Sequence, residues 1–153
     1  MVDHKSDDRL HDAIELMYFA YREFTSHADK VLEKRGLNRV HHRILYFIGR
    51  NPNLRVGELL ETLAISKQAL NAPMRQLIEM NLVCTAADEA DRRVKRLCLT
   101  GKGKQFEGEL TGSQIKHLGK VFGAVGNDDA GKWFRVMTEL SGRAGDAPAG
   151  AKA

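Results

Sequence analysis

The sequence predicts a mainly α-helical fold with a small β-hairpin, built around a winged helix-turn-helix core. Apolar residues recur at helical spacing along most of the chain. Residues 54–83 have the spacing of a helix-turn-helix. Two β-prone runs, 82–86 and 94–99, follow directly and flank a polar tip. Because a helix-turn-helix followed by a hairpin is a winged helix, we expect that fold class.

Two helices are expected before the core motif. From Leu10 to Val31, apolar residues alternate in steps of four and three, which places them along one stripe of a long helix. Gly36 is suited to the C′ position that ends it. Asn38 can cap a second helix, and the turn 49–52 ends that helix.

The core motif begins with a short strand and a short helix, followed by a tight turn at 63–65. A longer helix then starts at Ser66, which can cap it. Pro73 lies inside this helix, where its missing N–H leaves the Ala69 carbonyl without a helical partner. We expect a continuous helix that bends between these two residues rather than two pieces joined by a loop.

Two further helices are expected after the hairpin. Thr100 can cap the first, which starts near Lys102, and a break at 126–129 separates it from the second. Glycine inside a helix costs about 1 kcal/mol relative to alanine, so the glycines of the first need a reason. Either they let another helix approach closely, within the chain or across a subunit interface, or they reflect chance in a glycine-rich protein. They are Gly108, Gly112, Gly119 and Gly123.

Length and composition limit the organisation. A chain of 153 residues, 42% of them hydrophobic, can bury one core. We expect one compact domain over 9–141, a disordered arm over 1–8 and a disordered tail over 142–153. No apolar run is long enough to span a bilayer, and the polar N-terminus does not resemble a signal peptide, so we expect a cytoplasmic protein. A net charge of +4 permits an anionic partner.

The helix after Ser66 has two chemically distinct faces. On a helical wheel, apolar side chains gather on one side, among them Ile78, and polar side chains including Gln76 gather on the other. Glutamine, asparagine and arginine can hydrogen-bond base edges, and alanine can contact a thymine methyl group. The alternative is an ordinary solvated face. The expected DNA contacts are Ser66 and Lys67 at phosphates, and Gln68, Asn71, Ala72 and Arg75 at bases.

The hairpin tip is basic. Arg92, Arg93, Lys95 and Arg96 fall within five positions of each other. Narrow minor grooves attract such side chains, so we expect Arg92, Arg93 and Lys95 to contact DNA, with Arg93 as the principal residue. A solvated run of charge is the alternative.

Enzymatic and metal chemistry find little support. The stretch TGKGK at 100–104 lacks the glycine that a phosphate-binding loop requires, because Cys98 occupies that position. His41 and His42 are adjacent, so on a helix they point about 100° apart and cannot easily hold one metal ion. We therefore expect no enzyme activity, no metal and no cofactor.

Cys84 and Cys98 are the two cysteines of the chain. Their positions mirror each other about the hairpin tip, so they can be cross-strand neighbours on the outward face. Two cysteines are too few for a disulfide framework, and we expect reduced thiols. A redox role is the alternative.

The order of elements and the block DRRVKRLCLTGKG resemble the MarR family of bacterial transcriptional regulators, whose wing shows an Asp-x-Arg followed by Leu-Thr and a glycine. The corresponding residues here are Asp91, Arg93, Leu99, Thr100 and Gly103. The resemblance implies a homodimer that binds pseudo-palindromic DNA and is often released by a small ligand or an oxidant. It also implies that Asp91 orients Arg93 rather than contacting DNA.

The resulting expectation is a sequence-specific DNA-binding regulator, a homodimeric repressor more readily than an activator. Helices about 9–35 and 102–141 would form the dimer, and residues about 38–100 the DNA-binding part. A cavity lined by Tyr18, Tyr21, His42 and Tyr46 could admit an apolar or aromatic effector. The alternatives are a winged-helix protein-interaction module without specific DNA binding, and a redox-responsive regulator that uses Cys84 and Cys98.

Overall fold

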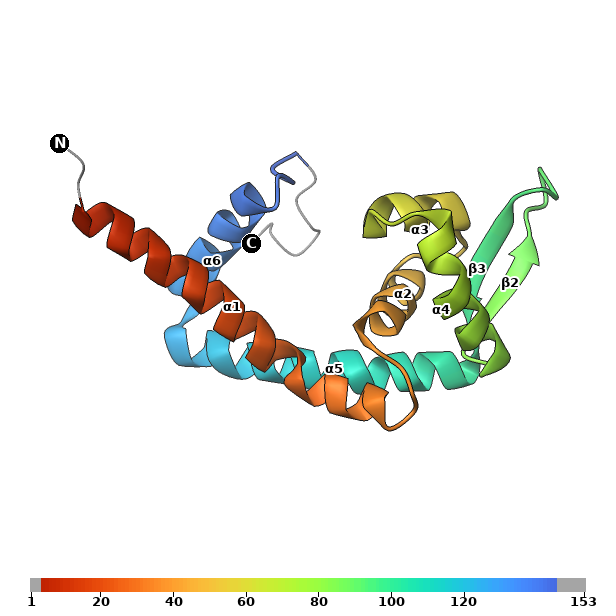
Figure 1. Ribbon diagram of the computed structural model, residues 1–153, viewed down its shortest axis with the longest axis horizontal. Coiled ribbons are helices and arrows are strands. Elements are labelled where there is room, and N and C mark those ends of the chain that lie inside the picture. The colour runs from red at the N-terminus through yellow and green to blue at the C-terminus, as the bar shows by residue number, and fades with distance from the viewer. Residues whose placement is uncertain (1–3, 146–153) are drawn as a thin grey trace. The chain divides into compact units, whose positions relative to one another are not determined.

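Helices account for most of residues 4–145, which are the residues that the computed structural model describes. In chain order the elements are α1 (His4–Glu33), α2 (Arg39–Arg50), β1 (Leu54–Arg55), α3 (Val56–Leu63), α4 (Lys67–Glu79), β2 (Val83–Ala87), β3 (Lys95–Leu99), α5 (Gly101–Val125) and α6 (Asn127–Leu140) (Figure 1). This is the predicted helical fold with a small hairpin. No helix among the described residues combines the length and apolar character that crossing a membrane requires.

The chain divides into two compact units, and the organisation as one domain over 9–141 stays a prediction. The first ends at Gln114 and the second begins at Ile115, so α5 spans the boundary. The predicted arm is also shorter than expected, because α1 begins at His4 and residues 4–8 are helical. The predicted tail falls largely on residues 146–153, which lie outside the described part of the chain.

Local capping signals set the helix ends much as predicted. Gly36 has φ 68° after α1, and the Leu37 N–H donates to the Leu32 carbonyl at 3.0 Å, which closes a Schellman turn. The Asn38 side chain caps α2 by accepting from the Val40 N–H at 3.0 Å. The Ser66 hydroxyl caps α4 by accepting from the Ala69 N–H at 3.1 Å.

Helix α4 runs through Pro73 without interruption, so the prediction of one continuous helix is confirmed. Two separate helices joined by a loop are therefore excluded. The bend that we expect near Ala69 stays a prediction.

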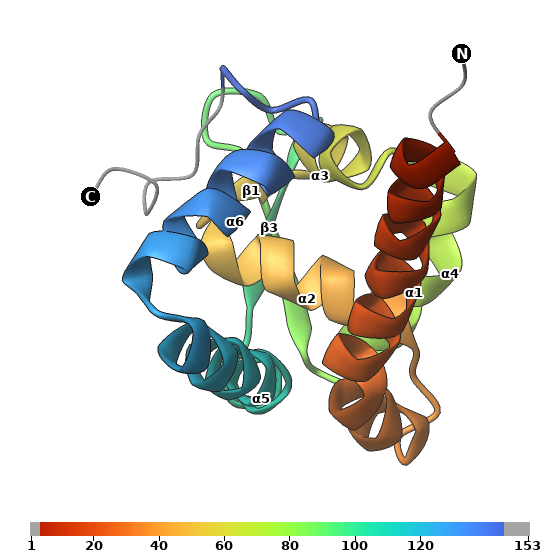
Figure 2. The same cartoon turned by 90° about the vertical axis from the view of Figure 1, so that its left-hand side faces the viewer.

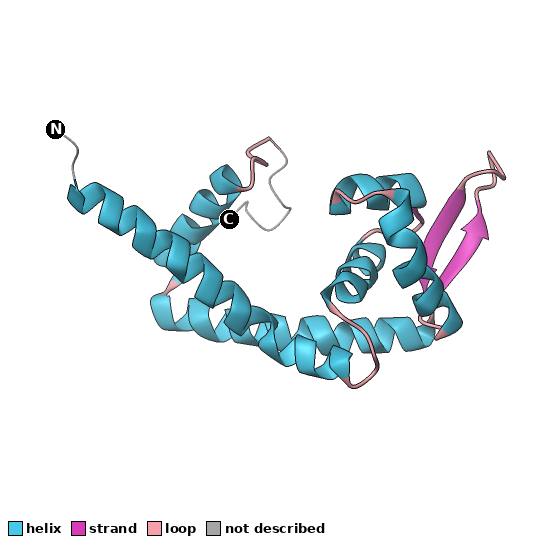
Figure 3. Ribbon diagram, in the orientation of Figure 1, coloured by secondary structure: helices cyan, strands magenta, loops and turns pink. Residues whose placement is uncertain are grey.

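Three strands form an antiparallel sheet in the order β1-β3-β2, with β2 and β3 as the wing (Figure 3). Val83 pairs with Leu99, and Thr85 pairs with Leu97. The side chains of Val83, Leu97 and Leu99 face the core, as alternation along a strand requires.

The end of α4, both wing strands and the start of α5 meet at the Leu82 backbone. The Leu82 N–H donates to the Leu77 carbonyl at 2.9 Å, and the Leu82 carbonyl accepts from the Thr100 N–H at 3.1 Å. The Thr100 hydroxyl donates to the Asn81 carbonyl at 2.6 Å and accepts from the Gly103 N–H at 2.9 Å, so it caps α5 as predicted. We call these contacts the Leu82 junction.

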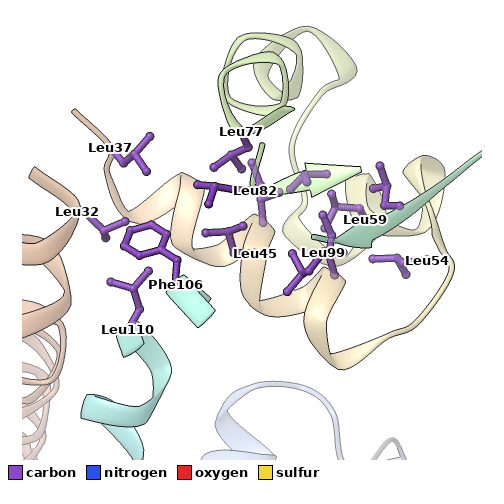
Figure 4. Packing of buried hydrophobic residues seen from close by; sticks show 14 of the residues in the cluster. Leu32, Leu37, Leu45, Leu54, Leu59, Leu77, Leu82, Leu99, Phe106 and Leu110 are labelled. Carbon is purple, nitrogen blue, oxygen red and sulfur yellow. The ribbon is translucent and has the colours of Figure 1, made fainter. Parts of the chain in front are cut away.

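A single hydrophobic core holds the first unit. Leu32 from α1, Leu45 from α2, Leu77 from α4 and Phe106 from α5 converge in it, and all four side chains are fully buried (Figure 4). Helix α2 packs against β3, α3 and α4, which places it at the centre of this unit (Figure 2). The DNA-reading candidates on α4 are therefore presented by a packed scaffold.

The second unit contains residues 115–125 of α5 together with α6. Phe122 lies against Trp133 and Phe134, with ring centroids 5.3 and 5.8 Å away. The predicted break at 126–129 is too long, because α6 begins at Asn127. Asp128 and Asp129 occupy the first turn of α6, where the helix dipole favours negative charge.

Gly103 offers a test of the Leu82 junction. A Cβ at this position would overlap the Leu82 carbonyl oxygen, whereas a Cβ at Gly108 meets no atom within 4 Å. We expect Gly103→Ala to lower the free energy of unfolding by about 1–3 kcal/mol through forced backbone displacement. Gly108→Ala should raise it by about 0.5–1 kcal/mol through helix propensity. Chemical denaturation measures both, and an equal gain from the two variants would contradict the close approach.

Candidate DNA-binding surface

The two faces of α4 separate as the helical wheel predicts, with two exceptions, Ile78 and Gln76. Leu70 and Leu77 are buried, and Pro73 is half-buried at the border. The helical wheel predicts that Ile78 is buried, but it is 42% exposed, because it lines a cleft beside α4. The predicted DNA contacts on this helix are all exposed, and they are Ser66, Lys67, Gln68, Asn71, Ala72 and Arg75.

Gln76 differs from the other polar residues of that face. Its side-chain oxygen lies 2.9 Å from His41 Nε2, and its amide nitrogen donates to the Gly36 carbonyl at 3.3 Å. The side chain is thus held against α2 and the loop before it. Of the glutamines on the wheel, Gln68 remains exposed and Gln76 does not.

Asp91 and Arg93 are in contact at the wing tip. The Arg93 N–H donates to Asp91 Oδ1 at 3.1 Å, and Arg93 Nε donates to the same oxygen at 3.2 Å. The Arg93 side chain nevertheless stays 92% exposed. The arrangement is what the family resemblance implies for an orienting carboxylate, and the contact of Arg93 with DNA stays a prediction.

Arg96 has a structural use instead. Its Nε donates to Asp88 Oδ1 at 3.1 Å, and a terminal nitrogen donates to the Asn53 carbonyl at 3.0 Å. The first bond lies within the hairpin, and the second fastens the wing to the turn before β1. The remaining basic residues of the tip, Arg92, Arg93 and Lys95, are exposed.

A cleft of about 910 Å³ lies between α3, α4 and the wing. Apolar side chains, among them those of Leu60 and Met74, form part of its lining. In Figure 1, α4 and the β2–β3 hairpin stand beside each other at this place. The cleft brings together predicted site residues from two elements, namely Lys67, Asn71 and Arg75 from α4 and Arg93 and Lys95 from the wing. Ser66, Gln68, Ala72 and Arg92 do not line it.

Arg55 also lines the cleft, and sequence reasoning missed it. It ends β1 and forms an ion pair with Glu58 at 2.7 Å. This pairing raises the pKa of Arg55 and lowers the pKa of Glu58. In the sequence, Arg55 is marked only as a basic residue between an expected strand and an expected helix. Glu61 and Glu79 lie along the cleft as well, so its charge is mixed.

The predicted effector residues lie on α1 and α2, and none of them lines this cleft. Tyr18 is exposed, and the Tyr21 hydroxyl accepts from Arg43 at 2.7 Å. His42 is buried 3.2 Å from the Thr111 hydroxyl, and burial lowers its pKa against the opposing effect of Glu107. Tyr46 packs edge-on against Phe47. The effector cavity stays a prediction.

Cys84 and Cys98 are directly opposite each other on β2 and β3, as predicted. The structure joins them by a disulfide, so the expectation of reduced thiols is wrong here. The physical reason is proximity, because the pairing brings their Cα atoms to 5.1 Å, well inside the range for a disulfide. Among the described residues, no group of three or more His, Cys, Asp or Glu side chains could hold a metal ion.

An exposed polar helix beside a basic wing, on a helix-turn-helix core, defines a winged-helix DNA-binding transcriptional regulator. Comparison with known proteins agrees. The chain is 39% identical over 135 residues to the HTH-type transcriptional regulator PetP of Rhodobacter capsulatus, covering 88% of this chain and 81% of the relative. Residues 35–94 match the MarR family. The chain belongs to the MarR family, whose members are regulators and not enzymes.

Solved structures show the same fold. Streptococcus pneumoniae FabT in complex with DNA has a TM-score of 0.78, at 15% identity, over 91% of this chain and 99% of that one. NadR in complex with 4-hydroxyphenylacetate has a TM-score of 0.69, at 18% identity, over 81% and 88%. At these identities the likeness shows the fold alone.

Proposed function

We propose that α4 enters the major groove of an operator and that the wing reaches the adjacent minor groove. The single observation that supports this most strongly is the cleft, because it gathers predicted contacts from both elements on one surface. Gln68, Asn71, Ala72 and Arg75 would read bases, and Ser66 and Lys67 would contact phosphates near the start of α4. Arg92, Arg93 and Lys95 would contact the minor groove, with Asp91 orienting Arg93.

The cleft itself would receive the sugar-phosphate backbone. A strand of DNA must pass between a helix in the major groove and a wing in the minor groove next to it. Lys67 and Arg75 stand on the α4 side of the cleft, and Arg93 and Lys95 stand on the wing side. The carboxylates of Glu61 and Glu79 would repel a phosphate that sat beside them, so they restrict where the backbone can run.

We propose that the protein works as a homodimer on a pseudo-palindromic operator, as a repressor in the cytoplasm, where chromosomal DNA lies. Helix α1 carries a row of exposed apolar side chains that includes Leu10, Ile14 and Met17. The second unit exposes others, among them Val136 and Leu140. Apolar surface on this scale usually marks an interface. Residues about 9–35 and 102–141 would form the dimer, and about 38–100 would bind DNA.

We further propose that a small apolar or aromatic effector releases the operator. NadR, which shares the fold, holds 4-hydroxyphenylacetate. Tyr18, Tyr21, His42 and Tyr46 supply aromatic surface and hydrogen-bonding groups for such a ligand once a dimer encloses them. Operator titrations with and without aromatic carboxylates test this, and an affinity that no such compound changes would reject it.

Arg93 provides the direct test of DNA binding. We expect Arg93→Ala to weaken operator binding by about 1–3 kcal/mol and to reduce the slope of log Kd against log salt by about 1, because one phosphate or groove contact is lost. Fluorescence anisotropy at several salt concentrations measures both, with DNA from the region flanking the protein's own gene.

Lys30→Ala is the matched control, since Lys30 is an exposed basic residue on α1 and away from the cleft. It removes the same charge and should leave the salt slope unchanged. If both variants weaken binding equally, the binding reflects a general attraction of DNA to a basic protein rather than a defined interface. If the wild-type protein shows no salt-dependent binding, the protein-interaction alternative is favoured.

Ile14 tests the dimer. A carboxylate in an apolar interface is costly to desolvate, so Ile14→Glu should shift the mass measured by light scattering toward the monomer. Asp12→Arg, on the opposite side of α1, changes the charge more and should leave the dimer intact. A dimer that survives Ile14→Glu would show that this face of α1 is not part of the dimer interface.

The disulfide supports a second candidate, a redox-responsive regulator. Its formation removes two electrons and two protons from the Cys84 and Cys98 thiols, which a peroxide or a disulfide oxidant would accept. The bond ties β2 to β3 below the basic tip and would restrict the wing.

Under this candidate the operator affinity of the wild-type protein differs between reducing and mildly oxidising conditions. The variant with Cys84→Ser and Cys98→Ser should show one affinity in both. Mass spectrometry gives the thiol state. Equal wild-type affinity in fully reduced and fully oxidised samples would mean that the disulfide has a structural role and does not regulate DNA binding.

A further inference from the structure

A chain of hydrogen bonds runs from the DNA-facing helix back to α2 and the loop before it. The Gln76 amide oxygen is 2.9 Å from His41 Nε2, and the Gln76 amide nitrogen is 3.3 Å from the Gly36 carbonyl. The Asn38 N–H donates to His41 Nδ1 at 3.0 Å. We call Gly36, Asn38, His41 and Gln76 the α4 tether.

The donors and acceptors of the tether fit one arrangement. Because the Asn38 N–H donates to His41 Nδ1, the neutral ring must carry its hydrogen on Nε2. Nε2 then donates to the Gln76 oxygen, which turns the Gln76 amide nitrogen toward the Gly36 carbonyl.

The tether fixes the rotation of α4 about its axis, which the core contacts of this helix do not fix by themselves. Leu70 and Leu77 are buried and hold the helix down, but hydrophobic contact has no preferred direction. Hydrogen bonds do, and they weaken steeply with misalignment. His41 is only 4% exposed, so its partner at Gln76 cannot be replaced freely by water. The tether thus resists rotation of α4 about its own axis.

Rotation of α4 matters at the distance of a base edge. Gln76 directly follows Arg75 and is one helical turn beyond Ala72. With side chains about 5–6 Å from the helix axis, a rotation of about 10° moves a contacting group by about 1 Å. That displacement is enough to spoil a bidentate hydrogen bond to a base, while a contact to phosphate tolerates it.

We propose that His41 and Gln76 are positioning residues that fix the rotation of α4 and so set the preference for operator over unrelated DNA. The proposal rests on the proposed function of α4 in the major groove. Gln76 does not read bases, although its place on the wheel groups it with residues that would. His41 acts through Gln76 and touches no DNA.

Two substitutions of His41 separate the tether from the cap of α2. His41→Asn keeps an acceptor near the position of Nδ1 for the Asn38 N–H but has no donor that reaches Gln76. His41→Gln places an amide N–H near the position of Nε2, and glutamine is a natural third residue in a helix-capping box. Gln76→Met removes the other end of the bond at nearly constant volume.

The experiment measures Kd for operator and for unrelated DNA, together with the thermal midpoint. We expect His41→Asn and Gln76→Met each to weaken operator binding about tenfold while binding to unrelated DNA changes less than about twofold. His41→Gln should restore most of the preference. The double variant with His41→Asn and Gln76→Met should lose no more than either single variant, because both act through one bond.

The outcomes separate this proposal from the function on which it rests. A wild-type preference for operator that both single variants retain overturns the tether and leaves the DNA-binding role intact. Equal losses on operator and unrelated DNA, or a His41→Gln variant no better than His41→Asn, also overturn it. If the wild-type protein shows no operator preference, the proposed function fails and the tether's role fails with it. Gln76→Met keeps the test decisive if His41→Asn does not fold.

Discussion

The Leu82 junction is the constraint on which the rest of the DNA-binding part depends. One peptide segment ends α4 through the Leu82 N–H, begins the wing, and accepts the Thr100 N–H where the wing returns. Gly103 lets α5 pass against the Leu82 carbonyl without a side chain between them. The Leu-Thr-x-x-Gly pattern of the wing thus has a physical reason, since Leu99 enters the core, Thr100 caps α5 and Gly103 permits the approach.

Because the junction joins α4 to the wing, the two elements can act on DNA as one surface. The wing is fastened near its tip by Arg96, whose side chain donates to Asp88 Oδ1 and to the Asn53 carbonyl. Its tip leaves Arg93 extended into solvent, held from one side by Asp91. On the other side of the cleft, the α4 tether holds Gln76 and leaves Arg75 exposed. Basic residues of similar appearance in the sequence therefore differ in the structure, because Arg96 holds the wing in place whereas Arg75 and Arg93 stay exposed.

Much of this could be predicted from local signals. Periodicity located the helices, and Asn38, Ser66 and Thr100 marked three of their starts because short polar side chains satisfy free N–H groups there. The direct pairing of Cys84 with Cys98 followed from strand alternation. The resemblance to the MarR family placed the wing residues, and the match over 35–94 confirms that family.

What the sequence could not reveal depends on contacts between distant segments. The partners of Gln76 lie 35 and 40 residues away, so the wheel could only show that it shares a face with Arg75. In the sequence, Arg96 and Arg93 are both arginines of one basic run, and only the fold brings Asn53 within reach of Arg96. Ile78 is exposed because the wing stands off from α4 and leaves a cleft. Whether the paired thiols form a bond depends on chemistry beyond strand register.

Protection of lysines from acetylation by operator DNA, read by mass spectrometry, tests the shared surface most directly. Lys67 on α4 and Lys95 on the wing are both exposed and both line the cleft, whereas Lys30 on α1 does not. If α4 and the wing bind DNA as one surface, Lys67 and Lys95 lose reactivity together over the same range of operator concentration while Lys30 stays reactive. Protection of only one of the two, or of Lys30 to the same extent, would contradict that account.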